Sequence, residues 1–245
     1  MQTVVIADDH ALVRKAYKMN IEQLGNYAVV AEAENGLVLL QVLQQLSQLP
    51  DIAFIDLRMP VIDGVATIDI ISFLHPSIKC IGISQYSQPN IVVDTLFAGA
   101  KGFLQKGYEN ELDELFNTLK SEQLYVSKNQ CAALLFYKEC SQKNLDKEAM
   151  INLLNKKEIL FLKLIAHGLS YEEIAKLLFV SISTLNSYQT SIKDKTSFAD
   201  KHRQILFAQQ NGIVKSLKIP PPPRSIYSST TIKKANSYST GFFQN

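Results

Sequence analysis

The fold is decided by two short runs of sequence, VVIADD at positions 4–9 and IAFID at positions 52–56. In each run, a stretch of apolar residues ends in carboxylates. An apolar run of about four to eight residues is typical of a strand buried in the interior of a sheet. Similar apolar runs occur at 27–33, 78–83 and 102–104, with helical spacing at 10–24, 37–48, 65–74, 89–98 and 109–120. Strands that alternate with helices at this spacing predict βαβ units and a parallel sheet.

Polar side chains follow four of these predicted strands. Asp8 and Asp9 follow the first strand, and Asp56 follows the third. Ser84 follows the fourth strand and Lys106 the fifth. With strand order 2-1-3-4-5, all of these groups reach one edge of the sheet, where open α/β sheets bind their ligands. Three carboxylates form the oxygen-rich site that Mg²⁺ prefers. The pattern predicts a magnesium site in which Asp56 accepts a phosphoryl group, Lys106 pairs with its oxygens and Ser84 donates a hydrogen bond to it.

Beyond residue 127 the strand pattern disappears. We expect a helix from Ser127 to about residue 140, followed by a polar linker at 141–148. Helical spacing then recurs near 156–167, 171–178, 182–195 and 200–211. The patterns Asn155-x-x-Glu158 and Ser170-x-x-Glu173 are typical of capping boxes, in which side chains satisfy free amides at a helix start. Gly168 suits a left-handed position after a helix. The short turn at 179–181 predicts a helix–turn–helix.

The charge of the chain is unevenly distributed. The net charge is −6 over residues 1–120, zero over 121–149, +3 over 150–212 and +5 over 213–245. This predicts an acidic module joined to a basic one, whose natural partner is nucleic acid because cationic side chains release counterions from phosphates. The basic residues of the second module that favour this partner are Lys156, Lys157, Lys193, Lys195, Lys201 and Arg203.

Other features of composition exclude several classes of protein. No run of about 18 apolar residues occurs, so we expect no membrane span. The first residues show no basic region ahead of an apolar one, which predicts no signal peptide and a cytoplasmic location. The cysteines Cys80, Cys131 and Cys140 lack CxxC spacing and are interpreted as reduced thiols. The tail at 214–245, with four prolines at 220–223, is expected to be mostly disordered.

Residues 1–120 resemble the receiver domain of bacterial response regulators. The matching runs are VIADDH at 5–10, DLRMPVIDG at 56–64, Ile83-Ser84, and GAKGFLQK at 99–106. Residues 150–212 resemble the LuxR-type helix–turn–helix. The matching runs there are KE at 157–158, LIAHGLS at 164–170, EIA at 173–175, Leu178, and STL at 183–185. Together they resemble the NarL/FixJ family of transcription regulators.

The resemblance implies an α/β fold, with a flavodoxin-like, doubly wound, five-stranded parallel receiver domain and an all-α helix–turn–helix domain. The implied divisions are a receiver domain at 1–122, a helical linker at 123–149, a DNA-binding domain at 150–213 and a basic tail at 214–245.

The resemblance also implies a phosphorylation switch. A histidine kinase would phosphorylate Asp56, beside Mg²⁺ held by Asp9, Asp56 and the backbone carbonyl of Arg58, with Asp8 acting through water. Ser84, Phe103 and Lys106 would form the switch, with Tyr86 able to share the part of Phe103. Arg58 and Gln85 depart from common patterns and are predicted to alter the rate of dephosphorylation. The phosphorylated chain is then expected to form a homodimer on double-stranded DNA.

The segment 182–195 is predicted to bury Ile182, Leu185 and Ile192 by its spacing. The resemblance places the DNA-contacting side chains on the opposite face: Ser183, Asn186, Ser187, Thr190 and Lys193. The family often has Lys, His and Asn where this chain has Asn186, Tyr188 and Ser191. Asn186 is suited to a bidentate contact with adenine and Thr190 to a thymine methyl, which predicts a preference for A·T pairs. Thr196, where the family has Leu, reduces the apolar burial at the end of this segment.

Two other function classes stay open at this point. In the first, the helical half binds protein and the chain is a signalling adaptor. In the second, the chain is an aspartate-based phosphatase, but such enzymes typically show Asp-x-Asp where this chain has Asp8-Asp9. We therefore expect no enzyme beyond slow self-dephosphorylation. Core packing is an equal explanation for Phe103 and for Ile205, Leu206 and Ala208 in the last helix, which the family uses for pairing.

Overall fold

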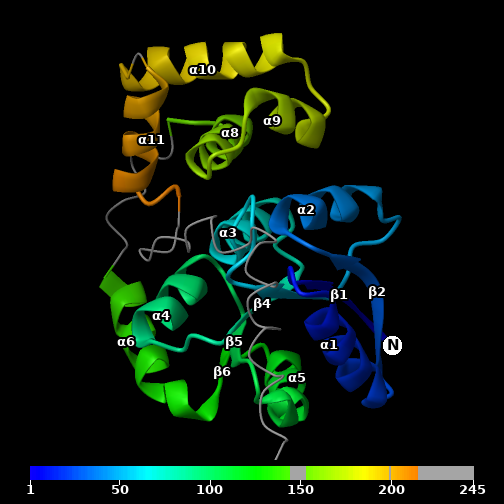
Figure 1. Cartoon of the computed structure of the whole chain (residues 1–245). Coiled ribbons are helices and arrows are strands. Elements are labelled where there is room, and N and C mark those ends of the chain that lie inside the picture. The colour runs from blue at the N-terminus through cyan, green and yellow to red at the C-terminus, as the bar shows by residue number, and fades with distance from the viewer. Residues whose placement is uncertain (144–152, 199, 215–245) are drawn as a thin grey trace, which may run out of the picture.

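The computed structural model describes residues 1–143, 153–198 and 200–214 (Figure 1). Its centre is a parallel sheet with the strand order β2-β1-β3-β4-β5-β6. The strands are β1 (Gln2–Ala7), β2 (Tyr27–Ala33), β3 (Ile52–Asp56), β4 (Lys79–Ser84), β5 (Gly102–Gln105) and β6 (Tyr125–Val126). The order expected for the first five strands is confirmed, and with it the doubly wound architecture.

The expectation of five strands is wrong, because β6 adds a sixth. Tyr125 pairs with Gly102 and Val126 with Phe103. The backbone amide of Ser127 continues the ladder, donating to the Phe103 carbonyl at 3.1 Å. Two residues are too few to produce an alternating pattern, so sequence spacing gives no sign of this strand. Its effect is to pair the otherwise open edge of β5.

Alternate residues of each strand face opposite layers of helices. Val4 and Ile6 face a core formed with α1 (Ala11–Gln23) and α5 (Leu112–Lys120). Val5 and Ala7 face a core formed with α2 (Gly36–Gln45), α3 (Gly64–Leu74) and α4 (Pro89–Phe97). This period of two follows from the pleat of a strand. A 3-10 turn, η1 (Glu109–Glu111), leads into α5.

The chain then passes from the sheet to a helix that lies on α4. After η2 (Lys128–Gln130), α6 (Cys131–Lys143) packs along α4, where the rings of Phe97 and Tyr137 meet edge to face at 4.8 Å. The Ser127 side chain does not cap a helix; its Oγ accepts a hydrogen bond from the Gln105 backbone amide at 3.1 Å. Of the predicted linker, residues 144–148 lie outside the described residues, as do residues 215–245 of the predicted tail.

The remaining helices form the second domain. They are α8 (Lys156–Ala166), α9 (Tyr171–Leu178), α10 (Ile182–Thr196) and α11 (Lys201–Gln210). Both predicted capping boxes are confirmed at the starts of α8 and α9. Gly168 has a φ of +89° directly after α8, as its glycine predicts. Within the described ranges, no helix is both long enough and apolar enough to span a membrane.

The two domains meet through α3 and α8, with α10 on the far side of the helical domain (Figure 1). Lys163 of α8 and Asp69 of α3 form a buried ion pair, with Nζ 2.8 Å from each carboxylate oxygen. Lys163 also donates to the Ile213 carbonyl, and His167 Nε2 lies 3.4 Å from Asp69. The Gln44 amide on α2 donates to the Leu177 carbonyl at the end of α9. Domain docking therefore combines an apolar seam with a buried charge pair.

Candidate functional site

The ends of β1, β3 and β5 bring three predicted residues into contact. The Lys106 ammonium lies 2.6 Å from Asp8 Oδ2 and 2.8 Å from Asp56 Oδ1. Both carboxylates are buried, and the lysine is largely so. The contact follows from the strand order, because β1 and β3 are neighbours and only β4 lies between β3 and β5. Asp56 is thus held beside one cation at the edge where such sheets bind ligands.

The electrostatics of the site centre on Asp56. Burial raises the pKa of its carboxyl to about 6, against the lowering effect of Lys106, and the charges of Asp8 and Asp9 add to the rise. Burial would lower the pKa of Lys106, but the charges of Asp56 and Asp8 outweigh it and raise that pKa. A second cation beside these carboxylates would favour the ionised form of Asp56, which is the form able to act as a nucleophile.

An acidic group that fits a divalent cation lies next to this contact. Oxygens of Asp8 and Asp9 and a ring nitrogen of His10 all lie within 4.8 Å of one another. His10 Nδ1 is 2.7 Å from Asp9 Oδ1, and its backbone amide donates to Asp8 Oδ1 at 2.8 Å. Carboxylate oxygens are hard ligands of the kind that suit Mg²⁺, which keeps several waters. Asp56 is not in this group; its oxygens accept from Lys106 and from the Arg58 backbone amide.

The other predicted switch residues lie around the same edge. Ser84 is buried, and its Oγ accepts a hydrogen bond from the Tyr86 backbone amide at 3.1 Å. Its carbonyl accepts from the Lys106 backbone amide at 2.9 Å, which ties β4 to the lysine. Phe103 is completely buried in the core against α2, α3 and α4.

Sequence reasoning missed a contact at the rim of the site. The Arg58 guanidinium lies over the Tyr86 ring, 4.0 Å from its centroid, and Tyr86 is 42% exposed. Such a cation–π contact holds the guanidinium in place. The sequence does contain a signal for this contact, because β3 and β4 are neighbours and each residue stands two positions after a predicted site residue at the end of its strand: Arg58 after Asp56, and Tyr86 after Ser84.

The loop after β3 is held close to Asp56 by a glycine. A Cβ on Gly64 would lie 2.1 Å from the Asp56 carbonyl oxygen, so only glycine fits there without a shift of the backbone. Asp63 caps α3 by accepting from the Ala66 amide at 2.8 Å. These contacts fix the return of the chain after the site, which explains the Asp-Gly pair in the matching run.

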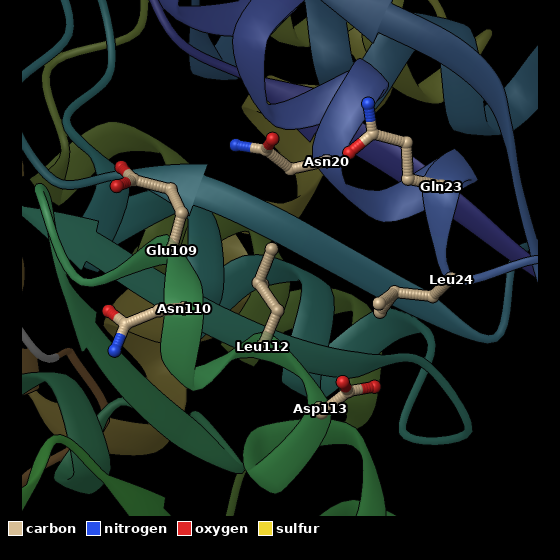
Figure 2. Close-up of a pocket in the computed structure, with 7 residues that line it drawn as sticks. All are labelled: Asn20, Gln23, Leu24, Glu109, Asn110, Leu112 and Asp113. Atoms are coloured by element: carbon tan, nitrogen blue, oxygen red, sulfur yellow. The ribbon is translucent and has the colours of Figure 1, made fainter.

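A polar pocket of about 250 Å³ lies elsewhere on the receiver, between α1 and the start of α5. Figure 2 shows its lining, which is Asn20, Gln23, Leu24, Glu109, Asn110, Leu112 and Asp113. None of the predicted site residues lines it. This pocket is therefore separate from the site formed by Asp8, Asp56 and Lys106.

In the helical domain, all the predicted DNA-contacting side chains are exposed on α10: Ser183, Asn186, Ser187, Thr190 and Lys193. The Ser187 hydroxyl donates to the Ser183 carbonyl and the Thr190 hydroxyl to the Asn186 carbonyl. Their hydroxyl protons are thus used within the helix, although both residues are exposed. The Asn186 side chain is exposed, and its amide carries both a donor and an acceptor suited to a base edge.

The expected burial of Ile182 is wrong. Leu185 and Ile192 are completely buried as predicted, but Ile182 is 44% exposed. It is the first residue of α10, and at about 100° per residue it lies about 60° around the helix from Leu185. Tyr188 faces the interior instead, where its ring meets Phe161 at 6.2 Å. The aromatic residue that stands where the family often has His is therefore part of the core.

One residue counted above among those favouring nucleic acid has a structural role. Lys195 Nζ lies 2.8 Å from both oxygens of Glu158, whose side chain is almost fully buried. Glu158 also accepts from the Ser191 hydroxyl at 2.7 Å and from the Asn155 amide at 2.8 Å. Lys195 and Ser191 thus join α10 to α8. Lys156, Lys157, Lys193, Lys201 and Arg203 are exposed.

The last helix divides between core and surface. Ala208 of α11 is buried, Ile205 is half-buried and Leu206 is 40% exposed. Gln204 is fully buried and donates to carbonyls of Gln189 and Phe198, which fixes α11 against α10. Core packing therefore accounts for Ala208, and Leu206 is left at the surface.

Known families match both parts of the chain. Residues 4–120 match the response regulator receiver domain, and residues 152–208 match the bacterial regulatory proteins of the luxR family. The transcriptional regulatory protein YdfI of Bacillus subtilis is 33% identical over 87% of this chain and 98% of its own. The oxygen regulatory protein NreC of Staphylococcus aureus is 28% identical over 86% of this chain and 98% of its own.

Solved structures of the response regulator RcsB share the architecture. One from Salmonella typhimurium has a TM-score of 0.51 and 26% identity, covering 85% of this chain and all of that one. An RcsB–DNA complex has a TM-score of 0.50 and 26% identity, covering 85% of this chain and 98% of that one. The chain therefore belongs to the response regulators that join a receiver domain to a LuxR-type helix–turn–helix domain, a family of transcription regulators rather than classical enzymes.

Proposed function

We propose that phosphoryl transfer from a histidine kinase to Asp56 controls binding of double-stranded DNA by α10. The observation that carries this proposal is the contact of Lys106 with both Asp8 and Asp56 at the carboxyl edge of the sheet. It is supported by the exposure of the predicted reading residues on α10. The proposed divisions are a receiver domain at 1–122, a linker at 123–149, a DNA-binding domain at 150–213 and a tail at 214–245.

In the proposed transfer, an oxygen of Asp56 attacks the phosphorus of the kinase phosphohistidine. The P–N bond breaks, its electrons remain on the imidazole, and an acyl phosphate forms on Asp56. Lys106 then balances the negative charge of the phosphoryl oxygens. Asp9, Asp56 and the Arg58 carbonyl would hold Mg²⁺, with Asp8 acting through water; the ion would supply charge neutralisation at the phosphoryl oxygens.

Phosphorylation would act on the rest of the receiver through Ser84. The added group carries about −1.5 to −2 charges. Its oxygens would compete for the Ser84 hydroxyl, which now accepts from the Tyr86 amide. Movement of Ser84 toward the phosphoryl group would be accompanied by a change in the packing of Phe103, the proposed switch aromatic. This is a shift between two packings, favoured by the contacts that phosphorylation adds to one of them.

DNA selection tests the proposed function. We expect the full chain to enrich a roughly two-fold-symmetric site from randomised duplexes at moderate salt, more tightly with a phosphoryl mimic at Asp56. The symmetry follows from a homodimer on paired half-sites. Asn186→Ala should lose about 1–3 kcal/mol of discrimination at an A·T position. A folded chain that enriches nothing in either state contradicts the proposal and favours the adaptor.

Arg58 and Gln85 are predicted to set the lifetime of the phosphorylated state. Arg58 stands two residues after Asp56 with its guanidinium over the Tyr86 ring, and we propose that it covers the approach of water to the phosphoryl group. We expect Arg58→Ala to shorten the lifetime several-fold, and Gln85→Ala, an exposed neighbour of Ser84, to change it less. Loss of radiolabelled phosphate with time measures slow self-dephosphorylation directly. Unchanged lifetimes in both variants would remove these residues from any part in hydrolysis.

A further inference from the structure

The exposed face of α10 begins with an apolar side chain. Ile182 is the first residue of the helix and is 44% exposed. Its place is fixed by Ser181, whose hydroxyl accepts from the Thr184 amide at 3.1 Å and caps the helix. The Ile182 side chain is therefore available at the start of the helix for an apolar contact outside the domain, and burial in such a contact would be favourable.

Ile182 shares its face with two of the predicted DNA-contacting residues. At about 100° per residue, Asn186 lies about 40° and Lys193 about 20° around the helix axis from Ile182. All three side chains are exposed. Leu185, on the buried side, lies about 60° away in the other direction. Ile182 therefore extends the exposed stripe formed by Asn186 and Lys193 to the start of the helix.

The position of Ile182 determines which chemical group it meets. In a helix–turn–helix, the N-terminal residues of the second helix contact base edges in the major groove. The apolar group that bases present there is the C5-methyl of thymine. Asn186, one turn further along, has the amide geometry that suits an adenine. An apolar side chain at the helix start and an amide one turn on thus match a short A·T segment.

We infer that Ile182 is a specificity-determining residue, which packs on a thymine methyl beside the base contacted by Asn186. This inference rests on the proposed function, since it needs α10 to lie in the major groove. The adjacent turn residue Phe179, which is 81% exposed with a left-handed φ of +52°, belongs to the turn and not to the stripe. Substitution of Phe179 therefore tests the alternative, in which the exposed apolar residues at this end of the domain contact a protein.

Thymine and deoxyuridine differ only by the methyl group, so they test the contact directly. Once the full chain has enriched a site, each thymine is replaced singly by deoxyuridine and binding is measured. We expect wild type to lose about threefold to fivefold in affinity at one thymine per half-site. Ile182→Ala should bind thymine and deoxyuridine equally there, and Ile182→Val should restore most of the difference.

Matched variants separate this contact from other causes. Leu153→Ala, an exposed leucine of the same domain outside α10, should keep the wild-type difference at that thymine. Phe179→Asn, which tolerates the left-handed turn, should keep it as well. The inference is overturned if wild type binds its site without any thymine preference, or if Ile182→Ala keeps that preference. Failure to bind any site overturns the proposed function too.

Discussion

Replacement of Asp56 by Asn is expected to reduce phosphoryl incorporation to background and to abolish the tightening of DNA binding by phosphoryl donors. The amide has nearly the shape of the carboxylate but lacks its charge and its nucleophilic oxygen. Lys106 keeps its contact with Asp8, so the surrounding structure has a reason to persist. Incubation with a phosphorylated kinase or with a small phosphoryl donor, followed by mass spectrometry of the intact chain, measures the result.

The matched control is Asp51→Asn at the opposite end of β3. Asp51 directly precedes the strand, is exposed and accepts hydrogen bonds from Thr3. Because it lies away from Lys106 and Asp8, we expect this variant to incorporate phosphate as wild type does. Full incorporation in Asp56→Asn would place the phosphoryl group on another residue. Loss in both variants would point to a general effect on folding.

The receiver site was accessible to sequence reasoning because its parts follow from strand order. Asp8, Asp56 and Lys106 each follow an apolar run, and the carboxyl ends of parallel strands share one edge. Once the order of five strands is predicted, their contact needs no further information. The capping boxes at Asn155 and Ser170 are local in the same sense, since both partners lie within four residues.

What the sequence did not reveal depends on contacts between distant residues. The two-residue strand β6 exists because β5 offers it an edge, not because of its own pattern. Ile182 has the spacing of a buried residue, but its side chain is 44% exposed at the start of α10. Lys195 has the charge of a DNA-contacting residue, but its ammonium forms an ion pair with Glu158. In each case the pairing or burial of the residue is determined by neighbours that are distant in the sequence, and local spacing does not identify those neighbours.

The domain interface also depends on contacts between residues that are distant in the sequence. Lys163 stands in an apolar stretch of α8, where a lysine would be expected at the surface. Its side chain is instead 7% exposed and paired with Asp69 of α3, which is equally buried. We expect Lys163→Met to destabilise the docked arrangement by about 3–5 kcal/mol, because it removes the ammonium that lies 2.8 Å from both oxygens of a buried carboxylate.

A loss of that size changes the ratio of docked to separated domains by more than about a hundredfold. Small-angle scattering should then show a larger radius of gyration for the variant, together with a lower unfolding temperature. Lys157→Met, an exposed lysine of the same helix, should change neither. The double variant Asp69→Leu/Lys163→Met should recover most of the loss, because an apolar pair of similar volume carries no desolvation cost. A Lys163→Met chain with wild-type dimensions and stability would show that the apolar seam alone holds the domains together.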